Sequence, residues 1–267
     1  MNAVETIFLK IDLNLDKSPI RQASKIIKSG GLVAFPTETV YGLGAVMRNE
    51  QAVRNIYKAK GRPEDNPLIL HIYKESQIFE LTENLSAYAK QLIDAFCPGP
   101  LTLVAEKSAL VPAWGTAGLD TVAIRMPGNP VALTLLEYVD EPVFAPSANT
   151  SGRPSPTRAE HVLKDLNKKI DCVLDGGSAV LGLESTVVDV TGKIPRILRP
   201  GYVTAKDIKS VVGAVELADN SDDKPKSPGT KYKHYAPNAE MRIVVGEPAA
   251  AAEEIIRLSR RLPRRLP

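Results

Sequence analysis

The segment FPTETVYGLG, residues 35–44, places two threonines, a glutamate and a tyrosine beside two glycines. An apolar run ends at Phe35, so these polar residues follow a predicted strand that leads into a site. The segment holds no serine, cysteine or histidine and no complete glycine-rich phosphate motif. Gly42 and Gly44 are expected to let the backbone turn tightly or come close to a ligand. The segment therefore predicts a binding loop without a protein nucleophile.

Two cations and a histidine stand in the segment KAKGRPEDNPLILH, residues 58–71. Lys60 and Arg62 flank Gly61 at the end of a helical pattern, where they could neutralise phosphates. They could equally complement the dipole at the C-terminus of that helix. His71 ends a strand pattern, and a single histidine there is either a ligand-binding or a structural residue.

Arg125 interrupts an apolar strand pattern, TVAIRMP, in residues 121–127. An arginine in such a pattern is costly to bury unless it is paired or faces a ligand. An edge position or an internal salt bridge is the alternative to ligand binding.

Small hydroxyl and amide side chains follow two further strand patterns. The loop VFAPSANTSGRPSPT, residues 143–157, and the segment GLESTVVDV, residues 182–190, carry them, and the segment RILRPG ends a strand in Arg199. Such groups could bind ribose, phosphate or an amino acid, although turns use the same residue types. The candidates are Ser147, Asn149, Ser151, Ser155, Ser185 and Thr186.

The sequence lacks the motifs of several enzyme classes. It contains no P-loop, no dinucleotide-binding glycine fingerprint, no GxSxG elbow and no HExxH or close Cys/His cluster. Cations and small polar groups at strand ends instead favour a reaction that runs by positioning and charge neutralisation, as in phosphoryl or nucleotidyl transfer.

Helical and strand patterns are mixed along the first 217 residues, and several strands follow one another directly. This order predicts an α/β (α+β) domain on a mixed sheet rather than a regular βαβ repeat. Helices are expected to begin at Ser18 and to span residues 50–60, 85–96, 131–139, 158–167 and 204–212. Strands are expected at residues 4–11, 32–35, 68–72, 101–106, 122–126, 143–145, 172–174, 186–190 and 196–198.

The composition changes after residue 217. Residues 218–239 are polar, rich in proline, glycine and charge, and predict a linker. A strand at residues 241–245 and a helix at residues 249–258 follow, too little to bury a core. The expected order is a catalytic domain at 1–217, the linker at 218–239 and the truncated start of a second domain at 240–267.

Composition and cysteine content limit the compartment in which the protein is expected. The chain has 267 residues, a net charge of +3 and two cysteines, Cys97 and Cys172, in no metal-like spacing. A disulfide framework or zinc site is not expected, and a reducing compartment is the default. Neither a secretory signal nor a membrane-spanning apolar run is visible in the sequence, so a cytoplasmic protein without a membrane partner is expected.

The motifs together resemble the YrdC-like family. GGLVAFPTETVYGLG, KAKGRPEDNPLILHI, TVAIRMP, FAPSANTSGRPS, LESTVVDV and ILRPG occur in the order and spacing of that family. SPGTKYKHYAP, residues 227–237, resembles the linker of its long-form members, the threonylcarbamoyl-AMP synthases. The resemblance covers roughly residues 1–240. The fold it implies is a twisted mixed β-sheet with flanking helices around a large open cavity, followed by a fragment of a Rossmann-like domain.

The resemblance implies a nucleotidyltransferase, an L-threonylcarbamoyladenylate synthase. L-threonine, bicarbonate and ATP would give L-threonylcarbamoyladenylate and pyrophosphate. The product would pass to the tRNA threonylcarbamoyl transferase machinery. The nucleophile would come from the substrate, and Mg²⁺ bound mainly through ATP would explain the missing carboxylate cluster.

Carried over motif by motif, the resemblance implies two sets of binding residues and a lid. L-threonine would be held by Thr37, His71, Arg125 and Ser185. ATP would be held by Lys60, Arg62, Asn66, Thr121, Ser147, Asn149, Ser155 and Arg199. Lys60 and Arg62 would also be catalytic by stabilising charge on the phosphates. The linker would close over the cavity through Ser227, His234 and Tyr235. Thr39 and Tyr41 would shape the wall, and Glu38 has no assigned role.

An RNA-binding module of the same fold without synthase activity is the alternative, and a weak RNA contact is compatible with either. A pI of about 8.7 favours it, whereas an aromatic content of 5% and the lack of a dense basic stripe count against it. Within the family, the linker disfavours a short-form paralogue. The lack of acylphosphatase-like and zinc-finger segments disfavours a hydrogenase maturation factor.

Overall fold

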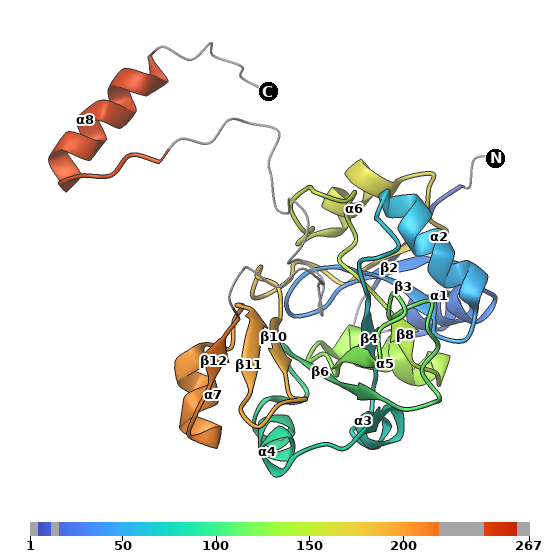
Figure 1. Ribbon diagram of the computed structural model, residues 1–267. Coiled ribbons are helices and arrows are strands. Elements are labelled where there is room, and N and C mark those ends of the chain that lie inside the picture. Colours follow the sequence, from blue (N-terminus) through green and yellow to red (C-terminus); the bar gives the residue numbers. More distant parts are fainter. Residues whose placement is uncertain (1–4, 12–15, 219–242, 261–267) are drawn as a thin grey trace. The chain divides into compact units, whose positions relative to one another are not determined.

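The computed structural model describes residues 5–11, 16–218 and 243–260 (Figure 1). The chain divides into two compact units, Met1–Ala236 and Pro237–Pro267. The first unit contains all the described strands and the helices α1 to α7. In the second unit, the described residues form one helix, α8 (Pro248–Ser259), which has no buried residue.

Strands and helices alternate irregularly along the first unit, as the sequence patterns predict. The strands are β1 (Ile7–Lys10), β2 (Val33–Phe35), β3 (Gly42–Val46), β4 (Ile69–His71), β5 (Thr82–Glu83), β6 (Leu101–Lys107), β7 (Thr121–Arg125), β8 (Val143–Phe144), β9 (Cys172–Asp175), β10 (Thr186–Asp189), β11 (Arg196–Arg199) and β12 (Glu216–Leu217). The helices are α1 (Ser18–Lys28), α2 (Glu50–Lys60), α3 (Ser76–Leu81), α4 (Ala87–Phe96), α5 (Pro130–Val139), α6 (Ala159–Leu166) and α7 (Ala205–Val212).

The described strands form one mixed sheet. Its order is β1-β9-β2-β3-β8-β4-β7-β6-β10-β11-β12, with β5 paired to β6. Parallel pairs such as β4 with β7 alternate with antiparallel pairs such as β6 with β7. The expectation of an α/β fold on a mixed sheet with flanking helices is therefore confirmed.

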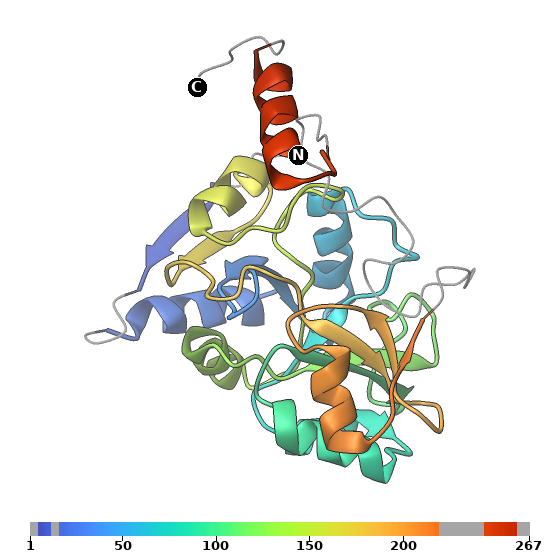
Figure 2. The same cartoon turned by 90° about the vertical axis from the view of Figure 1, so that its left-hand side faces the viewer.

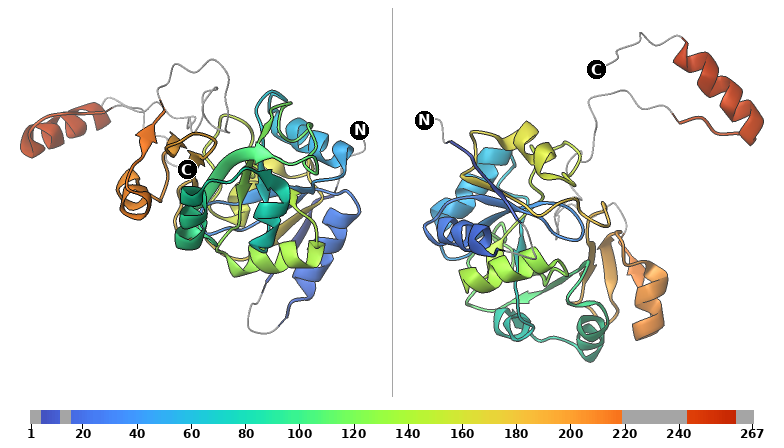
Figure 3. Two further views of the ribbon diagram at one scale, coloured as in Figure 1. Left: turned by 60° about the horizontal axis from the view of Figure 1, so that its bottom comes forward. Right: turned by 180° about the vertical axis from the view of Figure 1, so that it is seen from behind.

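Helices cover the sheet in separate groups. α1 and α5 lie side by side on one face (Figure 3), where Ile20, Ile27 and Leu135 pack against Val33 and Phe35. α4 and α7 lie against each other beside the other half of the sheet (Figure 2). Their apolar residues join those of α2, α3 and α6 in the larger core cluster. Both faces of the sheet are thus buried, which accounts for strands with nearly continuous apolar runs.

Local signals explain where helix α2 begins and ends. Asn49 accepts a hydrogen bond from the Ala52 amide at the N-terminus, and Gly61 ends the helix in the left-handed conformation with φ of +61°. The backbone then reverses, so Lys60 and Arg62 on either side of Gly61 enter the protein interior.

Gly42 and Gly44, expected in a binding loop, instead lie in strand β3. Helix α3 and strands β5 and β12 were not predicted, because such short elements do not show a period. In the predicted strand at 241–245, residues 243–245 are not in a strand and the other two lie outside the described residues.

Gly44 of β3 serves packing rather than a turn. A Cβ on Gly44 would lie 2.8 Å from the Phe35 ring and 2.8 Å from Val143. A side chain is therefore missing at Gly44 because the buried ring of Phe35 fills that space. Within the described residues, no helix is long and apolar enough to cross a membrane.

We predict that Gly44→Ala destabilises the protein by about 1–3 kcal/mol, since the new methyl group must displace Phe35 and Val143 in a close-packed core. Urea unfolding measures the change. Gly192→Ala is the control and should stay within about 0.5 kcal/mol, because its Cβ would lie 3.6 Å from the Ile194 carbonyl oxygen, an ordinary contact. Equal stability of the two variants would contradict the packing role of Gly44.

Candidate active site

A polar cavity opens where the predicted motifs meet. Its empty space is about 570 Å³, the open mouth included. Most of the residues predicted for threonine and ATP line it, namely Thr37, Arg62, His71, Arg125, Ser147, Asn149, Ser155, Ser185 and Arg199. Arg153 and Glu184 also line it, so arginines outnumber carboxylates in the lining.

Strand register brings His71 and Arg125 together. β4 and β7 run parallel, and these two residues are direct partners at the ends of their strands. The residues before them, Leu70 and Ile124, belong to the larger core cluster on the opposite face. Because side chains alternate across a strand, burying Leu70 and Ile124 turns His71 and Arg125 toward the cavity.

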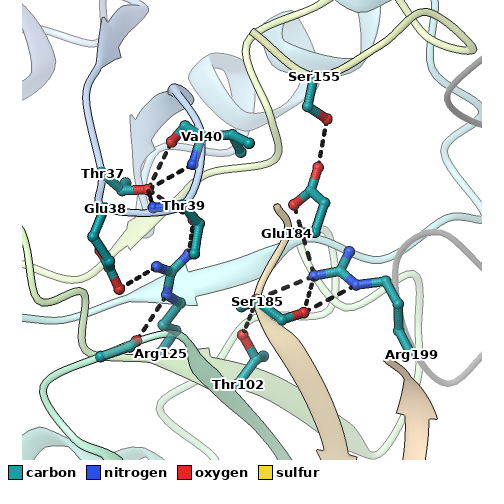
Figure 4. A network of polar contacts seen from close by, with 11 residues as sticks. Thr37, Glu38, Thr39, Val40, Thr102, Arg125, Ser155, Glu184, Ser185 and Arg199 are labelled. Carbon is teal, nitrogen blue, oxygen red and sulfur yellow. Dashed lines mark hydrogen bonds and ion pairs between the residues drawn. The ribbon is translucent and has the colours of Figure 1, made fainter. Parts of the chain in front are cut away.

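Arg125 is held by the segment that follows β2 (Figure 4). Its Nη2 donates to Glu38 Oε1 at 2.6 Å, and its Nη1 donates to Thr39 Oγ1 at 2.9 Å. Its Nε donates to the Gly99 carbonyl oxygen at 3.2 Å. Thr37 and Thr39 hydroxyl oxygens lie 2.9 Å apart, and the Thr37 hydroxyl donates to the Val40 carbonyl. The two threonines and the glutamate of the first motif thus form one network around Arg125.

Both interpretations of Arg125 apply at once. Its side chain is 4% exposed and forms an internal salt bridge, yet it lines the cavity. The contacts use three N–H groups of the guanidinium, which has five in all. Within the described part of the chain, the other two have no partner, so they can still bind a ligand carboxylate.

His71 is buried and uncharged at neutral pH. Burial, and to a smaller extent the Arg125 guanidinium, lowers its pKa from 6.5 to about 3. Its Nδ1 lies 3.2 Å from the Ile69 carbonyl oxygen, which can only accept, so the proton is on Nδ1. Nε2 is then left as a hydrogen-bond acceptor. The ring also meets Phe35 edge-on, with 6.2 Å between ring centroids.

A second arginine network lies at the start of β10 (Figure 4). Arg199 Nη2 donates to the Ser185 carbonyl oxygen at 2.9 Å and to its hydroxyl at 3.1 Å, and that hydroxyl lies 2.8 Å from Thr102 Oγ1. Glu184 Oε2 lies 3.7 Å from Arg199 Nη2, while its Oε1 accepts from the Ser155 hydroxyl at 2.5 Å. Glu184 therefore links two segments predicted to bind ATP.

Arg62 is braced against Asn66 at the other end of the cavity. Its Nη2 donates to Asn66 Oδ1 at 2.6 Å and to the Pro67 carbonyl oxygen at 2.9 Å. Among the described residues, Asn66 Nδ2 and Asn149 Oδ1 are buried without a hydrogen-bond partner. Unpaired buried polar atoms are rare in folded proteins, and these two mark places where a ligand can complete the hydrogen bonding.

Lys60 lies behind the cavity rather than in its lining. It is 2% exposed, and its ammonium donates to the Asn149 carbonyl oxygen at 2.6 Å and to the Ser147 carbonyl oxygen. Burial, followed by repulsion from Arg62, lowers its pKa from 10.5 to about 7. Lys60 therefore fixes the loop that carries Ser147 and Asn149.

The cavity lining does not include the predicted residue Thr121, and the predicted lid lies outside the described residues. Thr121 starts β7 opposite Glu106 and is not among the lining residues of the cavity. The lid residues Ser227, His234 and Tyr235 lie outside the described residues. Both cysteines are free thiols, and burial raises the pKa of each to about 12, which disfavours a reactive thiolate.

Two acidic residues were missed as functional candidates, Glu38 and Glu184. Glu38 follows Thr37 and Glu184 precedes Ser185, both predicted ligand-binding residues. Their positions beside these residues were the signal in the sequence. The arginine partner of Glu38, Arg125, lies 87 positions away in the chain, whereas Arg199 lies much closer in sequence to Glu184.

Comparison with known proteins agrees with this geometry. A family model for Sua5, YciO and YrdC, described as "Telomere recombination", matches residues 25–201, and one described as "Threonylcarbamoyl-AMP synthase, C-terminal domain" matches residues 203–265. The chain belongs to the Sua5/YciO/YrdC family. The resemblance predicted from the motifs is thus confirmed.

Named relatives and solved structures span most of the chain. A protein named threonylcarbamoyl-AMP synthase from Pyrococcus abyssi is 49% identical over 90% of this chain and 72% of its own length. One of the same name from Bacillus subtilis is 48% identical over 89% of this chain and 70% of its own length. The crystal structure of P. abyssi Sua5 complexed with L-threonine is 46% identical, with a TM-score of 0.90 over 96% of this chain and 76% of that one. Escherichia coli YciO has a TM-score of 0.69 at 25% identity, covering 77% of this chain and 99% of that one.

We predict that His71 makes the free energy of unfolding depend on pH. In the unfolded chain His71 is protonated below about pH 6.5, whereas in the folded protein it is protonated only below about pH 3. The free energy of unfolding therefore decreases as the pH falls through this window. Between pH 6.5 and pH 5 the loss is about 2 kcal/mol.

Urea unfolding of the protein and of His71→Gln across this window isolates the contribution. The variant should lack the His71 component of the pH dependence, whereas His161→Gln, at an exposed position, should keep it. A stability difference between the protein and His71→Gln that does not change with pH would contradict a neutral buried His71.

Proposed function

We propose that this chain is a threonylcarbamoyl-AMP synthase that converts L-threonine, bicarbonate and ATP into L-threonylcarbamoyladenylate and pyrophosphate. One observation carries the proposal. The motif residues meet around one cavity, in a chain that is 49% identical to a relative named threonylcarbamoyl-AMP synthase. A structure at TM-score 0.90 is described as a complex with L-threonine.

The threonine half-site would be formed by Thr37, His71, Arg125 and Ser185, all of which line the cavity. The unused N–H groups of Arg125 would bind the carboxylate of threonine. Neutral His71 would accept a hydrogen bond through Nε2, and Ser185 offers a hydroxyl. The half-site thus provides both donors and acceptors for a small polar amino acid.

The ATP half-site would be formed by Arg62, Ser147, Asn149, Ser155 and Arg199, which also line the cavity. The two arginines would neutralise phosphate charge, and the unpaired Oδ1 of Asn149 would accept from the nucleotide. Thr121 and the linker residues Ser227, His234 and Tyr235 would complete the site.

Two further predicted residues would support this half-site. Asn66 would act with Arg62, through its own unpaired Nδ2. Lys60 would contribute as the buried cation behind the loop of Ser147 and Asn149. A direct contact of Lys60 with phosphate requires its ammonium to leave the two carbonyl oxygens.

The reaction needs positioning more than protein chemistry. The threonine amine, after losing a proton, attacks bicarbonate, forming a C–N bond with loss of water. A carbamate oxygen then attacks the α-phosphorus, and pyrophosphate leaves with the electron pair of the broken P–O bond. Arg62 and Arg199 would stabilise the charge that develops on the phosphates. The carbamate is labile, so exclusion of water from the cavity would protect it.

The residues present fit a magnesium ion that is held mainly by ATP. Among the described residues, no group of three or more His, Cys, Asp or Glu side chains could hold a metal. Glu184 and the Ser155 hydroxyl, 2.5 Å apart in the lining, could supply oxygen ligands to a hard cation whose other ligands are phosphate and water. Bound there, Mg²⁺ would help neutralise the triphosphate.

The adenylate would then serve the tRNA threonylcarbamoyl transferase machinery, and we place the reaction in the cytoplasm, where its substrates are found. The RNA-binding alternative is not favoured, because the cavity residues account for small-molecule substrates. A weak RNA contact beside the synthase reaction stays part of the proposal.

Pyrophosphate release by the full chain, with ATP, Mg²⁺ and bicarbonate, tests the proposal. Release is expected only when L-threonine is present. Release without threonine, or none at all, would overturn the proposed function. Steeply salt-dependent RNA binding without pyrophosphate release would favour the RNA-binding alternative.

We further predict that Arg125→Lys weakens L-threonine binding at least tenfold, or about 1.4 kcal/mol. A lysine ammonium cannot reach Gly99, Thr39, Glu38 and a carboxylate together in one plane, as the guanidinium fork can. Calorimetric titration with L-threonine measures the loss. Arg48→Lys, at an exposed position, is the matched control. Equal threonine affinity of Arg125→Lys and the unmodified chain would contradict the role of Arg125.

A further inference from the structure

Glu38 pairs with Arg125 of the threonine half-site and has no part in the proposed reaction. Its side chain is 15% exposed, and its Oε1 pairs with Arg125 Nη2 at 2.6 Å. Within the described residues, its Oε2 is buried and has no hydrogen-bond partner. The charge of Glu38 is therefore poorly screened by water and acts on the half-site through Arg125.

The backbone fixes Glu38 in this position. Its carbonyl oxygen accepts from the Leu181 amide at 2.8 Å, and the residues on either side, Thr37 and Thr39, share the hydrogen-bond network of Arg125. Glu38 is thus locked between the loop that precedes Glu184 and the end of β7. The carboxylate itself is held by its ion pair with Arg125.

The pair leaves the threonine half-site without net charge. Arg125 contributes one positive charge and Glu38 one negative charge, while Thr37 and Ser185 are neutral and His71 is uncharged at neutral pH. The other charged residues of the lining differ, because Arg62, Arg153 and Arg199 share one lining carboxylate, Glu184, and Arg153 also pairs with Asp165. Three positive charges against two negative charges leave this group net positive, whereas the Arg125–Glu38 pair is electroneutral.

We propose that Glu38 is a positioning and specificity residue that makes this half-site select a zwitterion, an amino acid with both ammonium and carboxylate, over an anion without the ammonium. The inference rests on the proposed function and deepens it. Arg125 binds the carboxylate of the ligand, and the negative potential of Glu38 compensates the positive charge of its ammonium. Phosphate and pyrophosphate, which bring no positive charge, are disfavoured there.

Calorimetry with two ligands of the same skeleton tests the proposal. L-threonine is compared with 3-hydroxybutanoate of matching configuration at the hydroxyl carbon, which keeps the carboxylate and hydroxyl but lacks the ammonium. The unmodified chain should prefer L-threonine at least tenfold, and Glu38→Gln should lower that ratio about tenfold or more, since one charge is removed from a partly buried site.

Control variants separate charge from shape. Glu38→Asp keeps the charge on a shorter side chain, so it should retain the preference for L-threonine even if both affinities fall. Glu83→Gln makes the same chemical change at an exposed position and should behave as the unmodified chain does. Unfolding curves of each variant report whether it is folded.

The outcomes are distinguishable. If Glu38→Gln weakens both ligands equally and leaves their ratio unchanged, Glu38 is only structural and the inference is overturned. If Glu38→Gln does not fold, the unmodified chain still tests the inference. Equal affinities of that chain for L-threonine and 3-hydroxybutanoate overturn the inference without any variant. If the unmodified chain binds no L-threonine and releases no pyrophosphate, the proposed function fails and the inference with it.

Discussion

The need to pair a buried guanidinium underlies the arrangement of the cavity. Arg125 ends a strand in which it follows three buried apolar residues, so its charge must be compensated within the protein. Its partners are Glu38 and Thr39 after β2 and Gly99 before β6. Satisfying one side chain therefore ties three distant segments together. The requirement recurs around Arg199, whose partners Ser185 and Glu184 connect β11 to the start of β10.

Packing and electrostatics are coupled in the same region. The absence of a side chain at Gly44 leaves room for the Phe35 ring, and that ring meets His71 edge-on. Burial of His71 in turn removes its charge at neutral pH. The balance of charge around Arg125 thus depends on a glycine that never touches a ligand.

Much of the fold and of the site composition followed from local patterns. His71 was placed correctly at a strand end, and Arg125 was placed correctly in its strand, because the apolar residues and the polar residue that follows them lie within a few positions. Strand β3 was missed, since its two glycines are typical of a loop until the Phe35 ring is seen to need the space at Gly44. Lys60 was predicted at a phosphate, whereas its ammonium contacts carbonyl oxygens of the loop 87 and 89 positions away.

The sequence by itself determined the family, the mixed α/β fold and the kinds of side chain that surround the cavity, because these are carried by motifs and by short-range periodicity. Tertiary structure alone decided which charges meet. Glu38 and Arg125 are joined by the order of strands in the sheet, which no local pattern encodes. It also decided which groups are charged, because burial shifts the pKa values of His71 and Lys60 and depends on every element packed around them.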